Sequence, residues 1–210
     1  MGMKFYFSPY STAAVTVDVL AELEHGRPEP IAERIQLDIQ KGESRTAEYL
    51  AEVNPNGMVP AIVHDGTAIW ESAAITMYLG ELYGVDASPQ LYPAPGPKRG
   101  EAMKWISWAN AQLAPAASRL SLIVNDVQKC VDKEEEEKAA RDKLVKIMAI
   151  VDGQLKDKDY LLGSEYTIVD THVWAFISYP VDYMKVDVSS LPTLSAWRDR
   201  IRARPQLKDL

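Results

Sequence analysis

The sequence predicts an α/β domain followed by an all-α domain. Three observations lead to this expectation. Residues 3–83 contain short apolar strands and helical patterns in the order β-α-β-α-β-β-α. Residues 84–97 contain four of the 13 prolines, which indicates a linker. Residues 98–210 show helical periodicity almost throughout, so they are expected to form the second, all-α domain.

The first three elements are predicted to be a strand, a helix and a strand. Lys4–Phe7 is an apolar run typical of a strand. A helix is expected from Ser11 to Glu24, because apolar residues recur at helical spacing and Gly26 follows as a stop signal. Residues 34–39 alternate strictly between polar and apolar, which predicts a half-exposed strand.

A hairpin and two helices complete the predicted α/β domain. Residues 46–53 predict a short helix. Asp65-Gly66 is a strong two-residue hairpin signal, and it separates apolar strands over 61–64 and 67–70. The next helix is expected to start with Ser72 as its N-cap.

The second half is predicted to contain four main helices. Pro115 should kink or split the first of them. Thr167 and Asp170 form a capping-box pattern at the start of a buried helix, on which His172 is expected to be an interior residue. The helices are expected over residues 98–125, 132–155 and 167–179, and from Pro192 to the Arg204-Pro205 stop.

Composition restricts the class of protein. The chain has 210 residues, 47% of them apolar, and a net charge of −7, which argues against a nucleic-acid partner. No apolar run approaches the length of a membrane span, and no secretory signal is visible, so a cytoplasmic protein is expected. Cys130 is the single cysteine, and the three histidines do not cluster with it, so no metal site is expected.

Residues 53–79 carry the features that point to a ligand. Pro60 stands where a strand should begin, so a cis bond after Val59 would turn the Val59 backbone away from the sheet. The N-terminus of the helix at Ser72 suits a carboxylate, because its first N–H groups are unpaired. A small acidic peptide such as glutathione would satisfy both.

The motifs of this stretch resemble the glutathione-binding half of cytosolic glutathione transferases. The matching strings are N-P-x-G-x-V-P-A at 54–61, D-G at 65–66 and W-E-S-x-A-I at 70–75. The resemblance extends along nearly the whole chain and implies a thioredoxin-like first domain and an all-helical second domain. It also implies a glutathione transferase of the Ser-type, active in detoxification as a homodimer, with glutathione as co-substrate and no permanently bound cofactor.

Such an enzyme must ionise a bound thiol, whose unperturbed pKa is about 8.5. One hydroxyl at the start of the first helix can do this by hydrogen bonding to the sulfur. Ser11 fits the family's position best and is ranked ahead of Tyr10, Thr12 and Tyr6. The alternative for Ser11 is a plain N-cap, and for the tyrosines a place in the core or at the rim.

The resemblance also carries over residues that bind glutathione. Val59 (through its backbone), Pro60, Glu71 and Ser72 match the motif. The loop from Lys41 to Arg45 matches a family loop that reaches the glycine carboxylate. Several classes have histidine where this chain has Ser44, so Lys41 or Arg45 is expected to substitute electrostatically.

Trp105 and Trp108 are the candidates for the electrophile pocket. They stand three residues apart on the helix that lines this pocket in the family, and Asn110 and Gln112 are possible polar liners. Core packing of the aromatic pair is the alternative.

The sequence is also compatible with other glutathione-dependent functions. The same activated thiolate could serve a peroxidase, an ether lyase or an isomerase, although the cysteine that thiol transfer uses is absent from the first helix. A non-enzymatic relative that only binds glutathione is a further alternative.

Overall fold

The computed structural model describes residues 2–9 and 11–208. Its first part is a four-stranded sheet with strand order β2-β1-β3-β4, in which β1 and β2 are parallel and the β1–β3 and β3–β4 pairs are antiparallel. The strands are β1 (Met3–Phe7), β2 (Ala32–Gln36), β3 (Ala61–His64) and β4 (Thr67–Trp70). Asp65 and Gly66 join the last two with positive φ values of 48° and 82°, as a tight hairpin requires.

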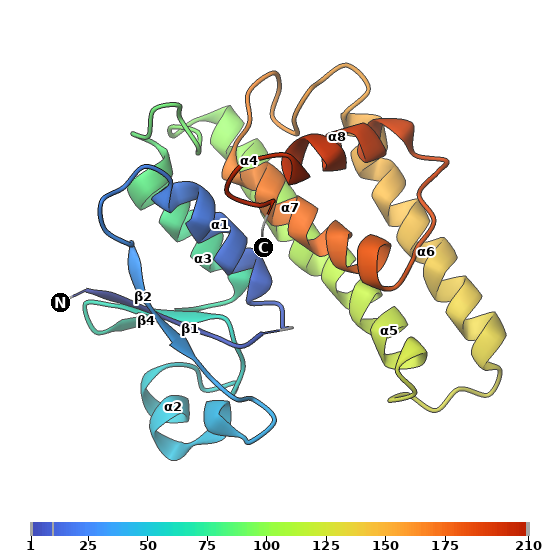
Figure 1. Ribbon diagram of the computed structural model, residues 1–210, viewed down its shortest axis with the longest axis horizontal. Coiled ribbons are helices and arrows are strands. Elements are labelled where there is room, and N and C mark those ends of the chain that lie inside the picture. The colour runs from blue at the N-terminus through green and yellow to red at the C-terminus, as the bar shows by residue number, and fades with distance from the viewer. Residues whose placement is uncertain (1, 10, 209–210) are drawn as a thin grey trace.

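Three helices cover the sheet. Figure 1 shows α1 and α3 together on one face and α2 on the other. The face with α1 and α3 is turned toward the helical half of the molecule. These helices are α1 (Ala14–Glu24), α2 (Ala47–Glu52) and α3 (Ser72–Leu79). The predicted order β-α-β-α-β-β-α is therefore confirmed.

The second part is helical. Figure 1 shows α4 running on into α5, with α7 beside α4 and α6 alongside α5. Helix α7 also packs against α1, so the two halves of the chain share an interface. The helices are α4 (Pro97–Trp108), α5 (Ala114–Val124), α6 (Lys133–Gln154), α7 (Ile168–Ser178) and α8 (Pro192–Arg202).

Some predicted boundaries were wrong. Helix α1 begins at Ala14, because Ser11 to Ala13 form a tighter turn in which the Ala14 N–H donates to the Ser11 carbonyl. Strand β2 covers 32–36 rather than 34–39, since its pairing with β1 sets its length. Ser72 is the first helical residue, and the N-cap position before it is held by Glu71.

The proline-rich segment before α4 is packed rather than loose. Tyr92 is fully buried, and the Leu91 carbonyl accepts the Ile168 N–H at 3.0 Å. Gly80 lets Tyr92 approach α3, since an added Cβ there would lie 2.7 Å from the Tyr92 ring. This segment therefore fixes the second part of the chain against the first.

The expected break at Pro115 is a change of helix type. Between α4 and α5, residues Ala109–Leu113 form a π-helical turn in which the Ala114 N–H donates to the Ala109 carbonyl. Pro115 has no N–H to offer at the start of α5, so the wider turn absorbs the missing bond.

One ion pair fastens two distant segments. The Arg204 guanidinium holds the Glu22 carboxylate of α1 at 2.6 Å and 2.7 Å, although the residues are 182 positions apart. The Glu22 side chain is only 1% exposed, so its carboxylate is desolvated, whereas the Arg204 side chain is 25% exposed. Within α6, Arg141 pairs with Glu137 and Lys138 pairs with Asp142.

Helix α7 is held by the predicted capping box. The buried Asp170 carboxylate accepts the Thr167 N–H at 3.0 Å, the Leu161 N–H at 2.8 Å and the Trp197 indole N–H at 3.0 Å. One carboxylate thus joins the start of α7, the preceding loop and α8.

Replacing Asp170 with alanine should lower the free energy of unfolding by about 3 kcal/mol or more, because several buried N–H donors would lose their acceptor. Urea denaturation of the Asp170→Ala variant would measure this. Asp157→Ala, at an exposed position, is the matched control and should change the value by no more than about 0.5 kcal/mol. Equal effects in the two variants would contradict this account of Asp170.

Candidate functional site

Strand register brings three segments of the predicted site to one rim of the sheet. Tyr6 of β1 lies opposite Ala61 at the start of β3, and Ala61 lies opposite Trp70 at the end of β4. The chain therefore leaves β1, enters β3 and leaves β4 at the same rim. The start of α1, the Val59-Pro60 bond and the start of α3 meet there.

Ser11 lies at this rim just before α1. Its hydroxyl donates to the Ser8 carbonyl at 2.7 Å, and its oxygen accepts the Ala13 N–H at 3.2 Å. The side chain is half-buried. Ser11 therefore closes the turn that starts the helix, and its hydroxyl can reach a ligand only by releasing the Ser8 carbonyl.

The other predicted hydroxyls have different settings. The Thr12 hydroxyl donates to the Val59 carbonyl at 3.4 Å. The Tyr6 ring is half-buried and packs edge-on against Tyr49, 5.8 Å between centroids. Burial raises the pKa of Tyr49 to about 12, so its hydroxyl is a neutral donor to the Met58 carbonyl at 2.7 Å. Tyr10 lies outside the described residues.

The Val59-Pro60 peptide bond is cis. No hydrogen bond of the Val59 N–H occurs within the described residues, so this donor is available at the rim. The Val59 carbonyl is not left entirely to a ligand, since it accepts a long hydrogen bond from the Thr12 hydroxyl.

Glu71 and Ser72 stand at the N-terminus of α3. Glu71 has φ of 73°, a conformation that costs a non-glycine residue energy and is often kept at binding sites. The Glu71 side chain is exposed, and Ser72 is 5% exposed. The first N–H groups of α3 carry partial positive charge, so an anion is favoured beside Ser72.

A buried polar chain leads away from Ser72. Its hydroxyl oxygen accepts the Asn110 amide N–H at 2.9 Å. The Asn110 carbonyl oxygen contacts His172 Nε2 at 2.9 Å, and His172 Nδ1 contacts the Thr76 hydroxyl at 2.8 Å. His172 is fully buried, which confirms it as an interior histidine. We call Ser72, Asn110, His172 and Thr76 the polar chain.

The loop from Lys41 to Arg45 lies beside the turn that precedes Val59. Ser44 is 3% exposed, and its hydroxyl donates to the Gly57 carbonyl at 2.9 Å. Lys41 pairs with Asp38 at 3.0 Å. Arg45 is exposed and has no ion pair within the described part of the chain. Ser44 thus has a structural role, and Arg45 is the available cation.

Trp105 and Trp108 form an edge-on pair on α4 with centroids 5.2 Å apart. Trp105 is 4% exposed, whereas Trp108 is half-buried. Trp105 therefore belongs mainly to the core, and Trp108 is the member that a ligand can contact. Gln112 is exposed, and Asn110 belongs to the polar chain.

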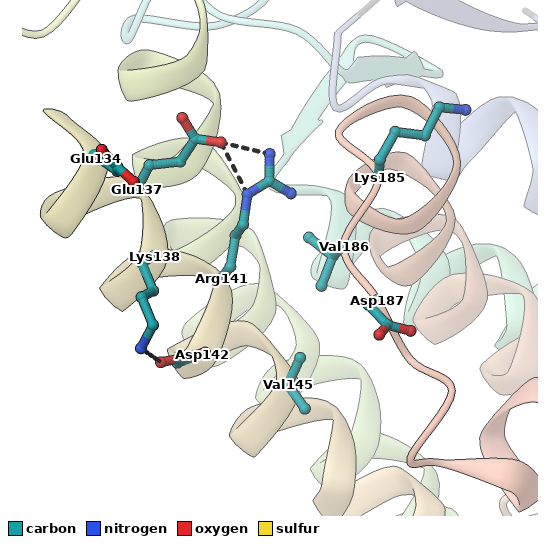
Figure 2. A pocket seen from close by; sticks show the side chains of 9 residues that line it. All are labelled: Glu134, Glu137, Lys138, Arg141, Asp142, Val145, Lys185, Val186 and Asp187. Atoms are coloured by element: carbon teal, nitrogen blue, oxygen red, sulfur yellow. Dashed lines mark hydrogen bonds and ion pairs between the residues drawn. The ribbon is translucent and has the colours of Figure 1, made fainter.

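A cavity of about 590 Å³ lies elsewhere, between α6 and residues 185–187. Figure 2 shows that its wall is charged and that Glu137 and Arg141 face one another across two hydrogen bonds. Lys138 pairs with Asp142, so the lining charges largely satisfy each other. None of the predicted site residues lines this cavity.

Sequence reasoning named Asn110 only as a possible polar liner and His172 only as an interior residue, and it missed Thr76. Their shared role depends on contacts between α3, the π-helical turn and α7. One signal was present, because Ser72 and Thr76 are four residues apart and so share a helix face.

Residues 2–9 and 11–208 contain neither a metal-binding cluster nor a membrane-spanning helix. No group of three or more His, Cys, Asp or Glu residues is arranged to hold a metal ion. None of the described helices combines the length and the apolar character that crossing a membrane requires.

Comparison with known proteins identifies relatives of both halves. Two family models match, "Glutathione S-transferase, N-terminal domain" over residues 7–82 and "Glutathione S-transferase, C-terminal domain" over residues 116–205. Glutathione S-transferase PARB from Nicotiana tabacum is 30% identical over 211 residues, covering 98% of this chain and 95% of the relative.

Solved structures of glutathione transferases also resemble this chain. Glutathione transferase F7 from Populus trichocarpa superposes with a TM-score of 0.81 at 26% identity, over 99% of this chain and 96% of its own. A glutathione transferase family member from Pseudomonas fluorescens, solved with two glutathione molecules bound, has a TM-score of 0.82 at 20% identity, over 99% and 91% of the two chains. At that identity the second match supports the fold alone.

His172 should make stability depend on pH. Burial lowers its pKa to about 3, although a hydrogen bond to the Ile106 backbone opposes this. Between the unfolded pKa of about 6.5 and the folded value, only the unfolded chain binds the proton. Stability should therefore fall as pH falls, by up to about 1.4 kcal/mol per pH unit from this residue.

Urea denaturation between pH 7.5 and 4.5 would measure that slope. His172→Gln cannot titrate and keeps a donor and an acceptor, so it is the matched control and should show a shallower loss between pH 6.5 and 4.5. Parallel slopes for the two proteins would mean that His172 is not held neutral.

Proposed function

This chain belongs to the glutathione S-transferase family, and from this premise we propose that it binds glutathione at the rim described above. The bound thiol is ionised there and attacks a hydrophobic electrophile. The observation that carries this proposal is the meeting of three features at one rim: the start of α1 with Ser11, the open Val59 N–H, and the anion-favouring start of α3 at Ser72.

The binding roles follow from the chemistry of glutathione, which has two carboxylates, one ammonium group and a peptide backbone. Val59 offers its N–H to that backbone, and Pro60 fixes the edge on which it lies. The γ-glutamyl carboxylate suits the N-terminus of α3 and the Ser72 hydroxyl, while the Glu71 carboxylate suits the ammonium group.

The glycine carboxylate at the other end of glutathione needs a cation. Arg45 is the stronger candidate, because it has no ion pair within the described residues, while Lys41 is 78% exposed and already paired with Asp38. Arg45 can also hold a carboxylate through two parallel hydrogen bonds, which a lysine cannot do.

Ser11 is proposed to ionise the thiol. Lowering a thiol pKa from about 8.5 by two units corresponds to about 2.7 kcal/mol and makes a large fraction thiolate at neutral pH. A hydrogen bond to sulfur and the positive end of α1 act in this direction. The Ser11 hydroxyl must turn from the Ser8 carbonyl to the sulfur, which leaves its bond from the Ala13 N–H in place.

The electrophile is proposed to bind against α4. Trp108 is half-buried, so its ring offers apolar surface to a hydrophobic substrate, and Trp105 supports that ring from the core. No metal and no permanently bound cofactor enters this chemistry, since the thiolate itself is the nucleophile.

The chain is further proposed to act in the cytoplasm as a homodimer, as the family resemblance implies. Light scattering at micromolar concentration should give twice the mass of one chain. A monomeric mass would remove the dimer from the proposal and leave the site in each chain unchanged.

The thiol role of Ser11 can be tested by titrating the ultraviolet absorbance of thiolate with glutathione bound. In the unmodified protein the thiol pKa should lie well below 8.5, and Ser11→Ala should raise it by about one to two units because the donor to sulfur is lost. Thr12→Val removes the neighbouring hydroxyl at nearly constant shape and is the matched control, which should leave the pKa unchanged.

Other results of this titration would assign the hydrogen bond to the glutathione sulfur to a different hydroxyl. A pKa that rises in Thr12→Val but not in Ser11→Ala transfers the role to Thr12. A pKa that is lowered in all three proteins leaves Tyr6 and Tyr10 as the donors. Binding of glutathione with an unshifted thiol pKa would contradict the transferase mechanism.

A further inference from the structure

The Ser72 hydroxyl has an acceptor role inside the protein but no donor role. Its oxygen accepts the Asn110 amide N–H, and no bond donated by this hydroxyl occurs within the described residues. A hydroxyl that is 5% exposed rarely leaves its hydrogen unused. Ser72 is the first residue of α3, where an anion is favoured and can accept that hydrogen.

The polar chain has one consistent hydrogen-bond direction. The Asn110 amide oxygen can only accept, and it lies 2.9 Å from His172 Nε2. His172 Nε2 therefore carries the ring proton and donates it to that oxygen. Nδ1 is then an acceptor and receives the Thr76 hydroxyl proton.

The same arrangement sets the role of the Asn110 amide nitrogen. With its oxygen occupied by His172, its N–H₂ group must face Ser72 and donate. Each hydroxyl proton in the polar chain is thereby assigned, and the Ser72 proton is the one left for a ligand. Reversing the direction would turn that proton inward, toward Asn110.

The polar chain is also held rigidly by the surrounding structure. Thr76 and His172 are fully buried, and Ser72 and Thr76 lie one turn apart on α3. Asn110 belongs to the π-helical turn and His172 to α7, so two elements of the helical half support a residue of the first half. Such a network holds one arrangement because a partly satisfied alternative is costly in a buried setting.

We propose that Asn110 and His172 are positioning residues that aim the Ser72 hydroxyl proton at the γ-glutamyl carboxylate of glutathione. This inference rests on the proposed function and adds to it the residues that set the direction of the Ser72 bond. Neither residue needs to touch glutathione, since both act through Ser72.

Asn110→Asp tests the proposal with nearly constant shape. A carboxylate cannot donate to the Ser72 oxygen, so the Ser72 hydroxyl should donate to it and turn away from the ligand. Isothermal titration calorimetry should show glutathione binding at least tenfold weaker, with the pKa of the bound thiol unchanged. Circular dichroism would confirm that the variant is folded.

A double-variant cycle separates positioning from charge repulsion. In a Ser72→Ala background, Asn110→Asp should weaken binding less than twofold, because there is no hydroxyl left to aim. A glutathione analogue without the γ-glutamyl α-carboxylate should bind the unmodified protein and Asn110→Asp equally. His172→Gln, which offers a donor and an acceptor, should bind glutathione like the unmodified protein, whereas His172→Leu should not.

The proposal is overturned if Asn110→Asp binds glutathione within twofold of the unmodified protein. It is also overturned if the loss is the same in the Ser72→Ala background or for the truncated analogue, since the effect would then not pass through Ser72. Failure of the unmodified protein to bind glutathione at all would instead refute the proposed function.

Discussion

The register of the four-stranded sheet is the constraint on which the site depends. Because Ala61 lies opposite both Tyr6 and Trp70, the ends of β1 and β4 and the beginning of β3 coincide at one rim. A slip of one residue in either pairing would move Val59, which precedes β3, or Ser72, which follows β4, relative to the end of β1, and would turn buried side chains to the other face. Hydrogen bonds between backbones thus set the relative positions of Ser11, Val59 and Ser72, and their side chains then supply the chemistry.

A second constraint is that polar groups buried at the boundary between the two halves must be satisfied. Ser72 and Thr76 face the helical half from α3, and His172 and Asn110 meet them with matching donors and acceptors. The same bonds therefore join the halves and orient a ligand-binding hydroxyl. The π-helical turn at Asn110 contributes to this, since it arises where Pro115 withholds a backbone donor and it carries the amide that reaches Ser72.

Much of the fold was predictable from local signals. The Asp65-Gly66 hairpin, the capping box of Thr167 and Asp170 and the stop at Gly26 each follow from a few neighbouring residues. Sequence failed where tertiary contacts decide the outcome: Ser72 resembles an N-cap, but its hydroxyl is committed to Asn110, 38 residues away. The apolar spacing of Trp105 and Trp108 fits both core and pocket, and only their different exposure separates them. The candidate site residues themselves came from motif resemblance, and the roles assigned to them remain predictions.

The pairing of Glu22 with Arg204 bears on how the chain is made. Ribosomes release the N-terminal half first, and domains generally begin to fold in that order. The Glu22 carboxylate of α1 receives its cation only after residue 204 has emerged, and α7, which packs on the same helix, also emerges long after α1. Until then this face of α1 is exposed, with an acidic side chain that opposes premature burial and non-specific association. Arg204, 182 positions further along the sequence, therefore completes the surroundings of the helix that follows Ser11.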